Sequence, residues 1–369
     1  MKRKFLITCV LFAAVTSVFA LTACDGGHTH SGNTMRRNDS EHFKVCAECQ
    51  AYYDEEAHTP VDGVCTVCGY VVGYTQGLEL QYLHGGGYAV TGLGTATEAQ
   101  IVIPSYYVYE PVIAISERAF ENSAIKSVVI PDTVTKIEDR AFSGCTALES
   151  VTFGAHTEEL GSAVFKGCTA LKEMVLPQGI PAINDHLFES CTALKSVTVP
   201  DSVKKIDFQA FIFCGALEEV IVSDESKLVE IANGAFSDCK KLKTFEFPQG
   251  FQTIGSGAFG GCESLNNIVL PDSLIDVDGF AGCTSLSTIK FGNAVETIAK
   301  SAFERCAALQ AVSLPATLKN IGAFAFSSCN ALADLYFAGT QTQWDEVEQG
   351  EFWNQKEGDP IHLHINATN

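Results

Sequence analysis

Residues 254–271 read IGSGAFGGCESLNNIVLP, and the same order of residue types recurs along most of the chain. In this stretch Cys262 follows a phenylalanine by three residues and precedes a leucine by three. Nine cysteines with this setting recur at intervals of 21 to 25 residues, most of them 23: Cys145, Cys168, Cys191, Cys214, Cys239, Cys262, Cys283, Cys306 and Cys329. A fixed period in the twenties is typical of a solenoid in which each repeat forms one coil.

The second half of each repeat predicts a short strand. Apolar residues stand six and eight positions after the cysteine, as Ile268 and Leu270 do, and this period of two indicates a strand with one buried face. Pro271 then ends the strand, because proline cannot donate a hydrogen bond to a ladder. A further copy at residues 115–131 has Ser123 in the cysteine position, so we expect ten coils.

The repeat reads approximately I-x-x-x-A-F-x-x-C-x-x-L-x-x-V-x-[IF]-P, and it resembles the BspA-like leucine-rich repeat of bacterial surface proteins. The resemblance places the repeats at residues 115–337, between a strand-rich N-terminal cap at 74–114 and a C-terminal cap at 338–369. It implies a right-handed leucine-rich-repeat solenoid with a parallel sheet on one side and loops and short helical turns elsewhere. It also implies attachment to the cell surface and adhesion to proteins or to other cells.

The repeat cysteines are expected to be free thiols packed in the core. Each stands between a phenylalanine and a leucine that the pattern buries, and cysteine behaves as a small, highly buried hydrophobe. Coils that stack about 4.8 Å apart would also bring neighbouring thiols within reach of a disulfide, which is the alternative.

The amino terminus is typical of an export signal. A positive segment at residues 2–4 precedes an apolar run at residues 5–20, which is too short for a confident membrane-spanning helix. Residues 21–24, LTAC, resemble a bacterial lipobox. That resemblance implies a lipoprotein signal peptide at 1–23, and an acylated Cys24 that holds the mature protein on the extracytoplasmic face of a bacterial membrane. A plain signal peptide is the alternative.

Four further cysteines predict a small metal module at residues 42–73, after a flexible tether at 24–41. Cys46 and Cys49 form one C-x-x-C pair, Cys65 and Cys68 form another, and fifteen residues separate the pairs. This spacing is typical of one structural zinc ion held by four thiolates, and the module resembles a zinc ribbon. Two disulfides or a redox-active pair are the alternatives, the former because export favours disulfides.

Composition and motifs argue against several functions. The chain has 24 Lys and Arg against 44 Asp and Glu, a net charge of −20, which excludes a surface built to bind nucleic acid. Residues 255–260 match G-x-G-x-x-G, but they fill variable positions of the repeat rather than a turn between a strand and a full helix. Residues 84–87, HGGG, lie between two strand-like runs and predict a hairpin turn. We therefore predict no enzyme and no small-molecule substrate.

The candidate binding face lies on the exposed strand positions, five and seven residues after each repeat cysteine. Its residues are Ser150, Thr152, Glu173, Ser196, Thr198, Glu219, Thr244, Glu246, Asn267, Thr288, Lys290, Ser313, Asp334 and Tyr336. These side chains are mostly small and polar, which suits a broad, flat surface for an extracellular protein or a cell-surface ligand. A passive spacer of the envelope is the alternative. His362 and His364 alternate on a terminal strand, where we expect packing or solvation rather than metal binding.

Overall fold

The computed structural model describes residues 74–108 and 110–366, together with the main chain of five earlier strands. Contacts divide the chain into two units, residues 1–58 and 59–369. In the first unit β1 (Asn33–Arg37), β2 (Glu41–Cys46) and β3 (Tyr52–Ala57) form an antiparallel sheet. Strand β1 thus lies within residues 24–41, for which the sequence predicted no regular structure. The second unit begins with the antiparallel pair β4 (Pro60–Val61) and β5 (Val64–Cys65).

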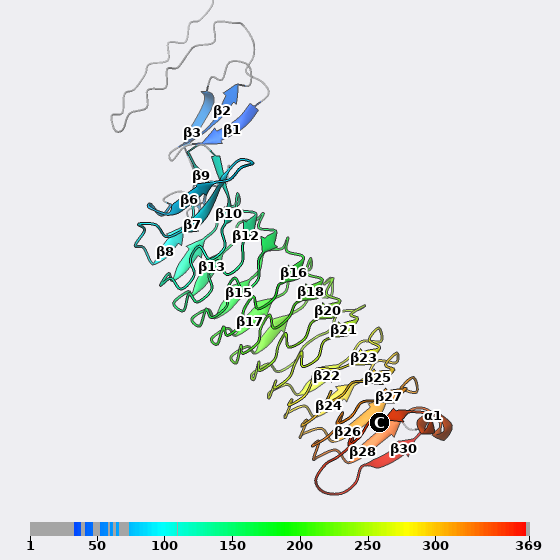
Figure 1. The fold of residues 1–369 in the computed structure, drawn as a ribbon. Coiled ribbons are helices and arrows are strands. Elements are labelled where there is room, and N and C mark those ends of the chain that lie inside the picture. Colours follow the sequence, from blue (N-terminus) through cyan, green and yellow to red (C-terminus); the bar gives the residue numbers. More distant parts are fainter. Residues whose placement is uncertain are drawn as a thin grey trace, which may run out of the picture. The chain divides into compact units, whose positions relative to one another are not determined.

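The rest of the second unit confirms the predicted repeat solenoid with a parallel sheet (Figure 1). The predicted strands form one row, here called the first row, in which each strand lies beside its counterpart from the next coil. Its members are β8 (Gln100–Val102), β11 (Ser127–Val129), β13 (Ser150–Thr152), β15 (Glu173–Val175), β17 (Ser196–Thr198), β19 (Glu219–Ile221), β22 (Asn267–Val269), β24 (Thr288–Lys290), β26 (Ala311–Leu314), β28 (Asp334–Phe337) and β30 (His362–Ile365).

A second row of parallel strands, which the sequence did not predict, runs along another side of the coils (Figure 1). Most of its strands have only two residues, and the second of these is usually the aliphatic residue that precedes the phenylalanine by five. The members are β7 (Tyr88–Gly92), β10 (Glu110–Ile115), β12 (Lys136–Ile137), β14 (Glu159–Leu160), β16 (Ala182–Ile183), β18 (Lys205–Ile206), β20 (Glu230–Ile231), β21 (Thr253–Ile254), β23 (Asp276–Val277), β25 (Thr297–Ile298), β27 (Asn320–Ile321) and β29 (Glu348–Gln349).

A ladder of turns joins successive coils on the remaining side. The main-chain N–H of each repeat phenylalanine donates to a carbonyl of the next coil, as Phe142 does to Val164 at 3.0 Å and Phe259 to Gly279 at 2.7 Å. Residues two positions before and after the phenylalanine adopt positive φ, for example Arg140 at 56° and Gly144 at 72°. Left-handed backbone costs a residue with a side chain about 1 kcal/mol or more, so the ladder offsets a recurring strain.

The core consists of stacked columns of identical residues. The ten repeat phenylalanines from Phe120 to Phe326 lie face to face, with neighbouring ring centroids 5.0 to 5.7 Å apart and planes within 15°. The repeat cysteines and leucines are fully buried beside them. All nine of these cysteines are free, which confirms the expected packed thiols.

Both ends of the solenoid are covered. At the start, β6 (Glu79–Tyr82) pairs antiparallel with β7, and Leu83 donates to Gly87 across the predicted hairpin turn at 2.9 Å. At the other end, β29 and β30 extend both rows beyond residue 337. The short helix α1 (Gln341–Asp345) begins with a capping box between Thr340 and Gln343, and it buries Trp344 against Phe337.

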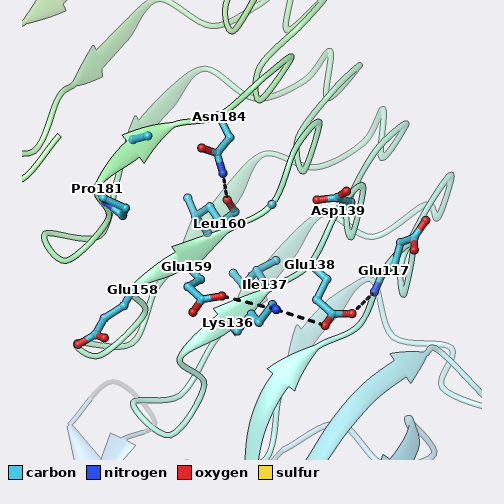
Figure 2. Close-up of a pocket in the computed structure, with 12 residues that line it drawn as sticks. Glu117, Lys136, Ile137, Glu138, Asp139, Glu158, Glu159, Leu160, Pro181 and Asn184 are labelled. Carbon is cyan, nitrogen blue, oxygen red and sulfur yellow. Dashed lines mark hydrogen bonds and ion pairs between the residues drawn. The ribbon is translucent and has the colours of Figure 1, made fainter. Parts of the chain in front are cut away.

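Each row is interrupted twice: the first between β13 and β15 and between β19 and β22, the second between β14 and β16 and between β21 and β23. Strand β13 is not paired with β15, and β14 is not paired with β16, although the turn ladder continues there through Phe165 and Leu187 at 3.0 Å. Pro181 contributes to the second-row gap because it has no N–H to donate to the preceding coil. The side-chain amide of Asn184 donates to the Leu160 carbonyl, at the place where main-chain groups donate in other coils (Figure 2). The gap between β19 and β22 lies at residues 244–247.

Candidate binding face

The first row sets its outward side chains in two columns because consecutive strands pair in register. Glu173 lies opposite Ser196, which lies opposite Glu219, and the same pattern runs from Lys290 to Ser313. None of the candidate face residues is buried. Ser150, Thr152, Glu173, Glu219, Thr244, Glu246, Asn267, Thr288 and Lys290 are exposed, whereas Ser196, Thr198, Ser313, Asp334 and Tyr336 are half-buried.

The strand expected around Thr244 and Glu246 is absent, so the prediction was wrong for this coil. Both side chains nevertheless point outward and are exposed, while Phe245 between them is buried.

Apolar side chains interrupt the polar face. Val175, Val269 and Ile221 occupy the same outward column as Thr152 and Thr198, with exposed fractions of 71%, 52% and 45%. Exposed β-branched residues in one column give the face apolar contact area that its charged residues alone would not provide.

The C-terminal end of the face carries an aromatic pair that the sequence did not suggest. The rings of Tyr336 and His364 stack with centroids 4.6 Å apart and planes 15° apart. His364 Nε2 lies 2.8 Å from Asp334 Oδ1, and His362 Nδ1 lies 3.9 Å from the same oxygen. Strand β30 therefore extends the face by one coil, and its two histidines contact a face residue rather than only solvent. The alternation of His362 and His364 in the sequence was the signal from which this extension of the face could have been predicted.

Charge on the face is only partly compensated. Lys243 Nζ lies 2.7 Å from Glu218 Oε2 beside the face, and this hydrogen bond and charge hold the pKa of Glu218 below its usual range. Among the described residues, Glu173, Glu219 and Glu246 have no ion-pair partner. The face thus presents free carboxylates to solvent.

A shallow depression of about 480 Å³ lies over the second row, at its interruption between β14 and β16 (Figure 2). Lys136 Nζ lies there 3.5 Å from Glu159 and 3.8 Å from Glu138, and the Glu117 N–H donates to Glu138 at 3.1 Å. The charged side chains around it are acidic except for Lys136. Within residues 74–108 and 110–366, no three His, Cys, Asp or Glu side chains are grouped to hold a metal ion.

The large pKa shifts in the described residues belong to the repeat thiols, which are buried and therefore out of reach of a substrate. Burial raises the pKa of Cys145, Cys168, Cys191, Cys239 and Cys262, and it raises the pKa of Cys214 and Cys283 to about 12. A hydrogen bond with Cys329 and then burial raise the pKa of Cys306. A buried, protonated thiol is a poor nucleophile.

The G-x-G-x-x-G match at residues 255–260 lies in turns of the repeat, with Phe259 in the buried stack and no helix after it. These glycines therefore occupy variable positions of the repeat, as the sequence predicted.

The predicted amino-terminal sites are described only in part. Cys24, Cys49 and Cys68 lie outside the described residues, while Cys46 ends β2 and Cys65 ends β5 as main chain only. Acylation of Cys24 and zinc binding by the four cysteines therefore stay predictions. In the part of the chain that the structure describes, no helix is long and apolar enough to cross a bilayer.

Comparison with solved structures finds several leucine-rich-repeat proteins. A leucine rich cell surface protein from Faecalibacterium prausnitzii is 23% identical, with 74% of this chain and 96% of that chain covered and a TM-score of 0.39. A leucine-rich repeat protein from Bacteroides ovatus is 21% identical, with 79% and 98% covered and a TM-score of 0.43. One from Eubacterium ventriosum is 17% identical, with 92% and 96% covered and a TM-score of 0.42.

No curated protein matches the sequence. The family described as BspA type leucine rich repeat region matches residues 113–230 and 229–347, well over half of the chain. The chain therefore belongs to the family of BspA-type leucine-rich-repeat proteins.

Proposed function

We propose that this protein is a lipid-anchored repeat protein of a bacterial cell surface, and that it binds another protein or a cell-surface ligand through the first-row face. The observation that carries the proposal is the in-register first row. Within each of its sheets the first row arranges the outward side chains of successive coils in two columns, and none of the candidate face residues is buried. Family membership supports a repeat protein of the surface type.

Binding suits this architecture better than catalysis does. The interior is filled by phenylalanine, cysteine and leucine columns, so the repeats enclose no room for a substrate. Repeat solenoids bind partners across many coils, because each coil adds the same small increment of surface. The face combines free carboxylates, small polar groups and exposed Val175, Ile221 and Val269, which is a mixture common in protein interfaces.

The anchor belongs to the same proposal. An acylated Cys24 would hold the chain at the membrane, and the module with Cys46, Cys49, Cys65 and Cys68 would bind one structural zinc between the anchor and the repeats. Attachment in this way needs no helix that spans the bilayer, since two acyl chains give stable anchoring.

Cells that display the full chain provide the test. We compare binding of immobilised matrix proteins and of host cells by the wild type and by the double variant Glu173→Lys/Glu219→Lys, which reverses two unpaired face charges. The matched control, Asp224→Lys/Glu225→Lys, makes the same charge change on the exposed turn after β19, outside the candidate face residues. We expect saturable binding that only the face variant loses. No saturable binding, or equal loss in both variants, would contradict the proposal and favour a passive spacer.

A further inference from the structure

The first row has one coil without a strand. Strand β19 ends one sheet and β22 begins the next, and residues 244–247 pass between them unpaired. Main-chain hydrogen bonds to both neighbouring coils stop at Lys243. Its N–H donates to the Glu218 carbonyl at 3.4 Å, and its carbonyl accepts from the Asn266 N–H at 3.2 Å. Among the described residues, the main chain of residues 244–247 makes no hydrogen bond. Strands β19 and β22 therefore have no main-chain hydrogen bonds to residues 244–247, which lie between them.

Ring packing and coil length set this coil apart. The first inward position carries an aliphatic residue or Met in the other coils, as Val197 does, but Phe245 in this one. The second inward position, Phe247, is phenylalanine in several coils. The rings of Phe245 and Phe247 lie 4.8 Å apart, and Phe247 also packs on Phe251 at 4.9 Å. A ring at the first inward position takes more room than the side chains found there in other coils. The preceding interval between repeat cysteines is also the longest, at 25 residues.

A hollow of about 340 Å³ opens where the pairing is lost, on the candidate binding face. Thr244, Phe245, Glu246, Phe247, Asn267, Val269 and Pro271 line it. Its apolar wall consists of half-buried Phe247, exposed Val269 and half-buried Pro271. The volume is at the lower limit of ligand sites, so the hollow suits one large side chain better than a cofactor.

Charge around the hollow is negative on the β19 side. Glu219 and Glu246 are exposed there, and neither has an ion-pair partner among the described residues. The nearby Lys243 is already paired with Glu218 at 2.7 Å. A cationic group next to the hollow would therefore meet two uncompensated carboxylates.

We propose that this hollow receives an aromatic or large aliphatic side chain of an extended peptide segment in a partner protein. A Lys or Arg beside that anchor faces Glu219 and Glu246. A pocket for one large side chain gives an extended peptide its specificity. The inference deepens the proposed function by naming the chemistry of the partner.

The test uses the full chain and a phage-displayed library of random seven-residue peptides as the probe. Selection on the wild type should enrich sequences with an aromatic or large aliphatic residue next to Lys or Arg. Selected peptides should bind the variant Val269→Trp at least tenfold more weakly, because the new ring fills the hollow from an exposed position. The control Val175→Trp changes the same outward column far from the hollow, and it should bind as the wild type does.

The role of charge is tested separately by Glu246→Lys. This variant should bind Lys-containing peptides more weakly than the wild type does, but it should bind their uncharged analogues equally well. Absence of enrichment, or equal affinity for wild type and Val269→Trp, would overturn the inference. If displaying cells bind partners through Glu173 and Glu219 while Val269→Trp has no effect, the inference fails and the proposed function stands. If peptides bind the hollow but displaying cells bind nothing, the proposed function fails instead.

Discussion

The thiol of Cys262 donates a hydrogen bond to the main-chain carbonyl of Phe236, one coil earlier, at 3.2 Å. The same bond recurs at all nine repeat cysteines, with distances of 3.0 to 3.3 Å. The Phe236 carbonyl also accepts the Cys239 N–H of its own coil at 3.1 Å. Cysteine at this position thus packs as an apolar residue and still supplies a donor to the neighbouring coil.

Replacement of this thiol should therefore be costly for its size. We expect Cys262→Ala to lower the free energy of unfolding by about 1–3 kcal/mol, because it removes both buried volume and the donor to Phe236. Urea unfolding measures the change. The control Ser264→Ala, at a half-buried position of the same repeat, should stay within about 0.5 kcal/mol of the wild type. Equal stability of the two variants would show that the thiol contributes little.

Alkaline pH should weaken the solenoid. Burial raises the pKa of Cys214 to about 12, whereas an unfolded thiol titrates near about 8.5. The folded chain holds this proton more tightly, so the stabilisation is complete below the unfolded pKa and is lost as the pH rises toward 12. Each such thiol should contribute up to about 1.4 kcal/mol of lost stability per pH unit.

Urea unfolding at neutral pH and at about pH 10 measures this loss, and Cys214→Ala provides the comparison. The variant should lose stability less steeply than the wild type by the contribution of one thiol. The same slope in both chains would mean that other groups cause the alkaline loss.

The side chain of Asn184 should be needed where the second row is interrupted. Asn184→Ala leaves the buried Leu160 carbonyl without its side-chain donor, at a cost of about 1–2 kcal/mol. Asn184→Asp should cost more, because a carboxylate cannot donate and faces the carbonyl with like charge. Thermal unfolding measures both, and exposed Glu158→Ala in the same depression should be neutral. Wild-type stability of Asn184→Asp would refute the role.

The four-cysteine module should hold one zinc ion. Metal analysis of the purified full chain should find one zinc per molecule, and Cys46→Ser/Cys49→Ser should remove it. A chelator should then expose four thiols to a thiol reagent while the repeat thiols stay protected until denaturant is added. A chain without zinc whose four module cysteines resist the reagent until a reductant is added would establish the disulfide alternative.

Cys24 should decide attachment to the membrane. In a bacterial host, Cys24→Ala should move the protein from the membrane fraction to the soluble exported fraction, because the acyl chains are its only predicted anchor. Cys9→Ala, within the signal, should leave the distribution unchanged. Retention of the Cys24→Ala chain in the membrane would contradict acylation.

The sequence predicted those features that repeat with a strong period. The columns of Phe259, Cys262 and Leu265 and the first-row strands follow from spacing and alternation, because a buried column needs the same residue type in every coil. The second row escaped prediction because a strand of two residues, such as β12, has no alternation to detect. The left-handed turns escaped it because residues such as Arg140 and His186 carry no local signal for positive φ.

The candidate face was predictable in position but not in detail. Outward positions follow directly from a period of two, so the exposure of Glu173 and Lys290 follows from the pattern. The gap at residues 244–247 depends on how the rings of Phe245 and Phe247 fit between neighbouring coils, which is a property of packing. The contact of His364 with Tyr336 depends on the pairing of β28 with β30, which are separated by α1 and a long connection.

The turn ladder and the thiol bonds also make nearly every junction between coils interchangeable. Each coil donates its phenylalanine N–H forward and its cysteine thiol backward, so a 23-residue coil removed from or added to the gene would meet neighbours with the same donors and acceptors. Unequal recombination could thus lengthen or shorten the protein in whole coils without a new kind of contact. The coil with residues 244–247 is the exception, because its cysteine follows a 25-residue interval and its first-row segment pairs with neither neighbour. Removal or addition of a coil there would bring together segments that lack the shared pattern of donors and acceptors.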